Sequence, residues 1–289
     1  MNKQFIRFLI LWFGGFVAAI GNGLTSFGLG VYVFEQTGLA SATTFIMLLA
    51  FLPALLLSPI AGVLADRYDR RLMMILGDGI SALGLIYIFI AMLNGEAALW
   101  QIGIGVTVSS VFSSLVEPAF RASISDLLTE DEYTKASGLV QISNSAKFLI
   151  SPMLAGYLLI VSNIKLLLII DICTIFITVL TSLIVRRGLG SKEVSINKSL
   201  FKELKEGFSI LIENQGVFNL VLVSAGISFF IGGIQSLYTP MILSFTDSYA
   251  LGKSTTISAM GMLVSSIFLG FVPIKKNTDS KDLKSIPFH

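Results

Sequence analysis

The chain has 289 residues, of which 54% are hydrophobic and only 13% are charged, and its formal net charge is +2. Soluble domains usually contain about 25% charged residues. The composition therefore excludes an ordinary water-soluble protein and predicts an all-α integral membrane protein.

Reactive side chains are scarce. Cys173 is the only cysteine and His289 the only histidine, which excludes an intrachain disulfide framework and leaves almost no material for a metal site. No catalytic constellation stands out either. We therefore expect no enzyme, no metal, no cofactor and no nucleic-acid partner, but a protein whose main partner is the lipid bilayer.

Eight segments are apolar and long enough to cross a hydrocarbon layer of roughly 30 Å, which takes about 20 helical residues. In chain order they cover residues 8–34, 43–65, 73–94, 98–118, 137–160, 166–185, 217–243 and 255–272. The long connection at 186–216 separates the first six from the last two. We expect a six-helix bundle over 1–185, a cytoplasmic connection over 186–216, and two helices with a polar tail over 217–289.

The connection carries its own pattern. Apolar and charged positions recur at helical spacing over residues 199–214, which predicts an amphipathic helix. Such a helix either lies along the cytoplasmic membrane interface or serves as a simple tether.

Basic residues fix the expected orientation. If the amino terminus is cytoplasmic, all but three of the 20 Lys and Arg residues fall in cytoplasmic segments, as the positive-inside rule requires. We expect a multi-pass protein of the plasma membrane with both termini in the cytoplasm.

The loop between the second and third spans has a distinctive composition. Residues 62–71 read Gly-Val-Leu-Ala-Asp-Arg-Tyr-Asp-Arg-Arg. The positions that carry the pattern are Gly62, Asp66, Arg67, Arg70 and Arg71. They resemble the signature loop of the major facilitator superfamily, a family of secondary transporters; the alternative is an ordinary charged cytoplasmic loop.

Other segments narrow the resemblance to the drug-efflux branch, which includes bacterial macrolide exporters. These are residues 32–38, 117–122, 216–218 and 258–262. The fifth span adds Ser151, Pro152, Ala155 and Gly156, which resemble the antiporter motif of drug exporters. The alternative for this motif is generic packing of small residues, and in either case Pro152 should bend the span.

The resemblance implies a fold and a function. Family members have two six-helix bundles, so this chain should hold the complete first bundle and the first two helices of the second. It implies efflux of a small amphipathic molecule, with a proton gradient as the suspected energy source. The alternatives are a truncated, inactive relative or a non-transporting membrane scaffold, and a second chain that supplies further helices is a conceivable partner.

The resemblance also gives expectations for the signature loop. Asp66 would contact the amino-terminal end of an eleventh helix, which this sequence does not contain. Asp69 stands where the family usually has glycine, so we expect a strained left-handed turn there. The three arginines are expected to pair with Glu117 or with anionic lipid headgroups.

Four ionisable residues fall in or at the edge of the spans: Asp78, Glu117, Lys147 and Asp171. A charge in the middle of a span costs about 2.5–3.5 kcal/mol on insertion scales, so each should face the bundle interior or a wet cavity. One hypothesis is that an acid carries the coupling proton, while Lys147 tunes it or contacts substrate. The other is a buried acid–base pair that only fixes packing. Three uncharged residues are candidates for the same cavity: Asn22, Thr25 and Gln141.

Overall fold

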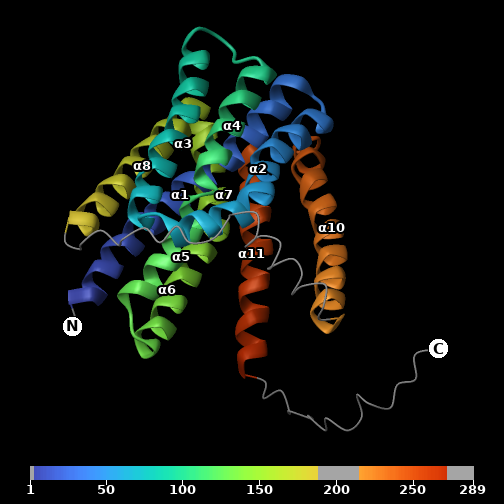
Figure 1. Ribbon diagram of the computed structural model, residues 1–289. Coiled ribbons are helices and arrows are strands. Elements are labelled where there is room, and N and C mark those ends of the chain that lie inside the picture. The colour runs from blue at the N-terminus through green and yellow to red at the C-terminus, as the bar shows by residue number, and fades with distance from the viewer. Residues whose placement is uncertain (1–2, 188–214, 272–289) are drawn as a thin grey trace, which may run out of the picture.

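The computed structural model describes residues 3–187 and 215–271, and every element within these ranges is a helix. In chain order the helices are α1 (Lys3–Thr37), α2 (Ala40–Arg67), α3 (Arg70–Leu93), α4 (Leu99–Ser113), α5 (Val116–Leu127), α6 (Glu130–Leu149), α7 (Ser151–Val161), α8 (Ile164–Arg187), α10 (Gln215–Leu243) and α11 (Ser248–Phe271). The expected amphipathic helix at 199–214 and the polar tail from 272 lie outside the described residues. Figure 1 shows α1 to α8 gathered in one bundle.

The helices reproduce the expected spans. Seven stretches of the described residues are long and apolar enough to cross a membrane: α1, α2, α3, α4 with α5, α6 with α7, α8, and α10. The eighth expected span is occupied by α11 over almost its whole length. The prediction of a helical membrane bundle is confirmed.

The fifth span is broken where the sequence predicts a bend. Helix α6 ends at Leu149 and α7 begins at Ser151, with Pro152 in the first turn of α7. Proline has no backbone N–H and its ring obstructs the preceding turn, so the helix cannot continue straight. At the break, the carbonyl of Leu149 accepts a hydrogen bond of 3.0 Å from the Thr256 hydroxyl on α11.

Helices α1 and α8 pack closely along most of their length (Figure 1). Three glycines of α1, spaced by seven residues, make this approach possible: Gly14, Gly21 and Gly28. A methyl group on any of them would overlap a side chain of α8, namely Thr181, Thr174 or Ile164. Small residues at such an interface are how membrane helices approach without a hydrophobic driving force.

Two apolar clusters lie at different depths of the bundle. One surrounds Phe8 and Met74 near the end that carries residues 62–71, which we call the loop end. The other surrounds Leu29, Ile88 and Leu167 toward the opposite end, which we call the far end. Buried polar side chains lie between or beside the members of these clusters, namely Thr25 on α1, Asp78 and Ser81 on α3, and Asp171, Thr174, Thr178, Thr181 and Ser182 on α8. The fold therefore encloses a polar layer at mid-depth.

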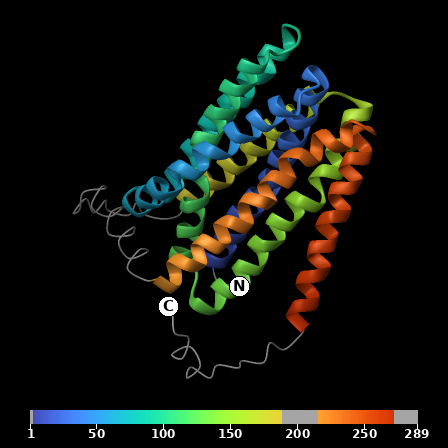
Figure 2. The ribbon, with the colours of Figure 1, turned by 90° about the vertical axis from the view of Figure 1, so that its right-hand side faces the viewer.

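Helices α10 and α11 lie beside the bundle (Figure 2). Helix α10 packs against α2 and α11 packs against α7. The α7–α11 contact is close because Gly156 faces Gly252: a methyl group on Gly156 would lie 2.6 Å from the carbonyl oxygen of Ser248. All residues from 215 to 235 are exposed, including Phe229 and Phe230, which suits contact with hydrocarbon.

Candidate functional site

Arg70 is the centre of the signature loop. Its Nη1 lies 2.7 Å from Oδ2 of Asp126 on α5 and also donates to the carbonyl of Ala122. Its Nε donates to the carbonyl of Ala65 at the end of α2 over 3.1 Å. One side chain at the start of α3 thus ties α2 and α5 together through charge-assisted hydrogen bonds.

Asp66 points outward from the same loop. Its side chain is 77% exposed, and Oδ1 lies 3.7 Å from Nη2 of Arg70. A pair this exposed contributes at most about 1 kcal/mol. Gly62 lies on α2, where a methyl group would meet no described atom within 4 Å.

The expectation of a strained left-handed turn at Asp69 is wrong. Asp69 has φ −61° and is the N-cap of α3, accepting hydrogen bonds from the backbone N–H groups of Arg71 and Leu72. Its Oδ2 also accepts from Nε of Arg186, near the end of α8, over 3.0 Å. The carboxylate gains a capping role and an ion pair that a glycine cannot provide.

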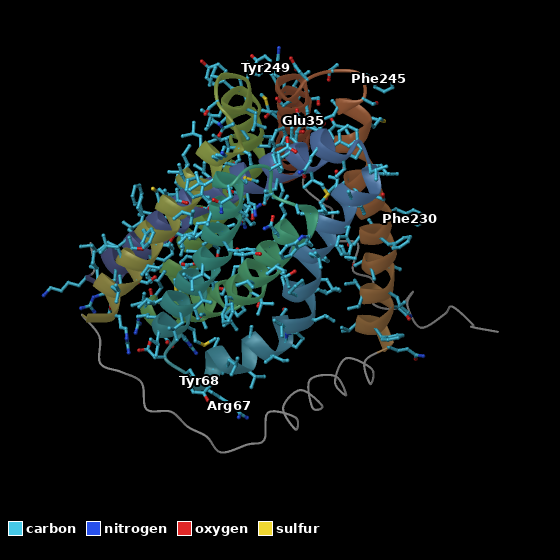
Figure 3. All side chains as sticks on the ribbon, turned by 90° about the horizontal axis from the view of Figure 1, so that it is seen from above. Glu35, Arg67, Tyr68, Phe230, Phe245 and Tyr249 are labelled. Atoms are coloured by element: carbon cyan, nitrogen blue, oxygen red, sulfur yellow. The ribbon has the colours of Figure 1, made fainter. Side chains whose placement is uncertain are left out.

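The expected pairing of the signature arginines with Glu117 is also wrong for Arg70. Glu117 pairs instead with Arg121, one turn later on α5, at 2.7 Å. Both side chains are mostly exposed, at 71% for Glu117 and 60% for Arg121. Arg67 is likewise at the surface of the loop end, as Figure 3 shows for Arg67 and Tyr68.

Asp78 on α3 and Asp171 on α8 lie in the buried polar layer. Only 8% of Asp78 and 1% of Asp171 are exposed. In each, the Oδ2 atom is buried and has no hydrogen-bond partner among the described residues. The two helices pack on each other, and Asp171 lies close enough for its charge to reach Asp78. Buried polar atoms are nearly always satisfied, so two such oxygens in one layer indicate a site.

Helix α1 forms one wall around Asp171. A methyl group on Gly21 would lie 2.9 Å from Oδ1 of Asp171, so glycine leaves room for the carboxyl group. Thr25, one turn along α1, is 4% exposed, and its side chain also lies beside the carboxyl group of Asp171. On α8 the Thr174 hydroxyl donates to the backbone carbonyl of Asp171 over 2.8 Å.

Lys147 approaches the same layer from α6. Its Nζ donates to Oδ1 of Asn22 on α1 over 2.7 Å, and its charge acts on Asp171. The structure thus brings Asp171 within electrostatic reach of two of the other three expected ionisable residues, Asp78 and Lys147. Glu117 stays exposed on α5, although its charge also reaches Lys147.

The uncharged candidates divide in the same way. Thr25 is buried in the polar layer, Asn22 is exposed and accepts the hydrogen bond from Lys147, and Gln141 is exposed on α6. The sequence interpretation missed the polar face of α8, which continues from Thr174 through Thr178 to Thr181 and Ser182, all buried. Hydroxyl residues at three- and four-residue spacing in an apolar span were the available signal.

The small-residue motif of the fifth span lies on α7, where α7 contacts both α1 and α11. Ser151, Pro152, Ala155 and Gly156 are all buried. The Ser151 hydroxyl donates to the carbonyl of Ile20 on α1 over 3.0 Å, while Gly156 contacts α11. Its small residues let α7 pack closely against both α1 and α11.

The signature loop, the broken fifth span and the polar layer agree with a comparison of the whole sequence. The family model of the Major Facilitator Superfamily matches residues 11–277. The chain belongs to this superfamily. It is therefore a multi-pass membrane protein of a transporter family, as its spans indicate.

Relatives of this superfamily chain include proteins with named activities. It is 30% identical over 272 residues to macrolide efflux protein A of Streptococcus pyogenes, covering 93% of this chain and 67% of the relative. It is 32% identical over 226 residues to macrolide efflux protein A of Enterococcus faecalis, covering 77% of this chain and 70% of the relative.

The fold is also found in solved transporters. A POT family transporter in complex with a thioalcohol-conjugated peptide aligns with a TM-score of 0.56 and 19% identity, covering 78% of this chain and 47% of that one. At this identity the likeness concerns the fold alone. The chain spans about two thirds of the length of its macrolide-efflux relatives and about half of the length of this structure.

Proposed function

We propose that this protein exports amphipathic small molecules of the macrolide type, driven by the proton gradient across the plasma membrane. Both termini then lie in the cytoplasm, with the loop end facing inward. The relatives named macrolide efflux protein A support the substrate class. The asymmetry of the basic residues supports the orientation.

One observation carries the coupling proposal: Asp78 and Asp171 are buried, lie within electrostatic reach of each other, and each keep an oxygen without a hydrogen-bond partner among the described residues. A proton can bind to such an oxygen without displacing another contact. Releasing that proton leaves a charge that must be compensated by water or by Lys147. Proton binding is therefore linked to the conformation that decides which side of the membrane reaches the layer.

Lys147 has two contributions in this scheme. Its ammonium group stabilises the carboxylate form of Asp171 through space. Its hydrogen bond to Asn22 holds the ammonium against α1, so a change in the packing of α6 against α1 alters that stabilisation. We propose Lys147 as a positioning residue for the proton site rather than as the proton carrier.

The test is efflux of a fluorescent amphipathic cation, and separately of erythromycin, from cells that express the chain by itself. We expect accumulation to fall when the chain is expressed and to recover when a protonophore removes the gradient. Equal accumulation with and without the chain, at confirmed membrane expression, would favour the non-transporting alternative.

A second experiment distinguishes coupling to protons from transport itself. Lys147→Met is expected to shift the pH dependence of export, because the carboxyl group of Asp171 loses its neighbouring positive charge. Lys253→Met, near the start of α11 and at the far end of the molecule, is the matched control. An unchanged pH profile in Lys147→Met would refute the positioning role.

A further inference from the structure

A cavity of about 470 Å³ opens at the far end of the molecule, away from the signature loop. Its volume lies within the roughly 300–1,000 Å³ of pockets that hold small ligands. Asp78, Lys147 and Asp171 do not line it. Figure 3 shows Glu35, one of its lining residues, at the opposite end of the molecule from Arg67. The cavity is thus separate from the proposed proton site.

One wall of the cavity is negative. Glu35 and Tyr32 share a face of α1 near its carboxyl end, and Glu96 follows α3 in the loop to α4. The chain turns at Gly95, whose φ of +134° favours glycine. Helices α1 and α3 both end here, and the carboxyl end of a helix carries about half a negative charge. Two carboxylates and two helix ends therefore all make this part of the cavity negative.

The lining also includes positive groups. It contains Lys165, at the start of α8, and Ser248, the first residue of α11. Both helices begin here, and a helix amino end carries about half a positive charge. Asn163 shapes this part of the lining by accepting a hydrogen bond from the backbone N–H of Lys165 over 3.0 Å.

The floor of the cavity is apolar. Met92 and Ile164 are almost fully buried beneath the opening, and Leu159 completes the surface. Among the described residues, no ion pair joins Glu35, Glu96 or Lys165 to another side chain. Charges of both signs thus face one cavity without being neutralised by each other.

We propose that this cavity binds a zwitterion, with its ammonium group toward Glu35 and Glu96 and its acidic group toward Lys165 and the amino ends of α8 and α11. A simple cation would meet the repulsion of Lys165, and a simple anion that of two carboxylates. Only a ligand with both charges complements both sets of groups. The ligand is either a free zwitterion or the headgroup of a lipid such as phosphatidylethanolamine, because exposed Leu93 and Trp100 place the opening at the membrane surface.

The experiment measures equilibrium binding of phosphoethanolamine to the purified chain in detergent, without any gradient, so its outcome is independent of export. We expect Glu35→Gln, Glu96→Gln and Lys165→Gln each to weaken binding by roughly tenfold, because each removes one charge-assisted contact. Lys253→Gln is the control: Lys253 is at the same end but lies over the Tyr249 ring, 5.4 Å from its centroid, and outside the cavity lining. Unchanged gel-filtration profiles confirm that the variants fold.

Whether Lys165→Gln weakens or strengthens phosphoethanolamine binding distinguishes a zwitterion site from a cation site. Stronger binding in Lys165→Gln would overturn the proposal in favour of a cation site, and equal binding in all variants would remove the site altogether. Reconstitution then identifies the source. If discs of phosphatidylethanolamine block phosphoethanolamine binding and discs of phosphatidylglycerol do not, the ligand is the lipid headgroup; if neither blocks it, the ligand is a free zwitterion.

Discussion

At the loop end, Asp69 and Asp126 each lie within 3.0 Å of an arginine nitrogen. Inside the bundle, Asp78 and Asp171 each keep one carboxylate oxygen without a hydrogen-bond partner among the described residues. The first pair of carboxylates connects helices: α3 to α8 and α3 to α5. The second pair is held by burial and close packing. The exposed and half-buried carboxylates of the loop end thus join helices through ion pairs, whereas the two buried ones make no ion pair among the described residues.

The contrast between the two pairs of carboxylates is tested most directly at Asp171. We expect Asp171→Asn to reduce gradient-driven export by tenfold or more, because the amide occupies the same volume but cannot take up and release a proton. The measurement is export from proteoliposomes with an imposed pH gradient. Drug exchange at equilibrium, without a gradient, should persist.

The matched control for this change is Asp247→Asn. Asp247 lies before α11, and its Oδ1 accepts from the backbone N–H of Ala250 over 2.8 Å, which an amide oxygen can also do. If gradient-driven export and exchange fall together in Asp171→Asn, the residue has a structural role. The buried carboxylates would then not differ in function from those of the loop end.

Packing around the buried carboxyl group of Asp171 gives the next largest effect. We expect Gly21→Ala to lower the free energy of unfolding by about 1–3 kcal/mol, because the added methyl group overlaps Thr174 and approaches Asp171. Thermal unfolding in detergent measures it. Gly15→Ala, on the same helix with no described atom within 4 Å, should be neutral or slightly stabilising; equal losses in both variants would contradict the tight α1–α8 interface.

Two variants of Asp69 distinguish the contribution of capping to stability from that of the ion pair. We expect Asp69→Ala to lower the free energy of unfolding by about 1–2 kcal/mol, because it removes the N-cap of α3 and the contact with Arg186. Asp69→Asn keeps a capping oxygen and should lose less than about 1 kcal/mol. Thermal unfolding of both variants checks the order. A loss in Asp69→Asn as large as that in Asp69→Ala would show that the ion pair stabilises the fold more than the cap does.

The smallest effect is expected at the exposed pair on α5. Glu117→Gln should change the free energy of unfolding by less than about 0.5 kcal/mol, because an exposed pair one helical turn apart contributes little. The same thermal unfolding assay applies. A loss as large as that of Asp69→Ala would show that exposure is a poor guide to which charges stabilise this fold.

Much of the fold follows from local sequence. Long apolar runs locate the spans because crossing hydrocarbon sets both their length and their composition, and Pro152 locates the break in the fifth span because it lacks a backbone donor. The three glycines of α1 have a regular seven-residue spacing, which was an available signal for a packing face. These features depend on residues close together in the chain.

The site was predicted less completely, because its contacts join distant parts of the chain. Asp69 looked like an unfavourable replacement for glycine, yet Arg186, 117 positions later, lies beside it. Glu117 looked like a partner for Arg70 because both lie near the same membrane face, yet Arg121 is one turn away and Asp126 is better placed. Which acids are buried was also undetermined, since burial depends on the rotation of each helix.

The contact between α1 and α8 has a consequence for biosynthesis. The first span leaves the ribosome well before the sixth, by about 7–30 seconds at 5–20 residues per second, so its row of glycines has no partner until α8 arrives. During that interval the newly made segment depends on the insertion machinery or on surrounding lipid. Among Asp78, Glu117, Lys147 and Asp171, Asp171 is the last to enter the bilayer, and it can pack beside Gly21 only after α8 has been inserted.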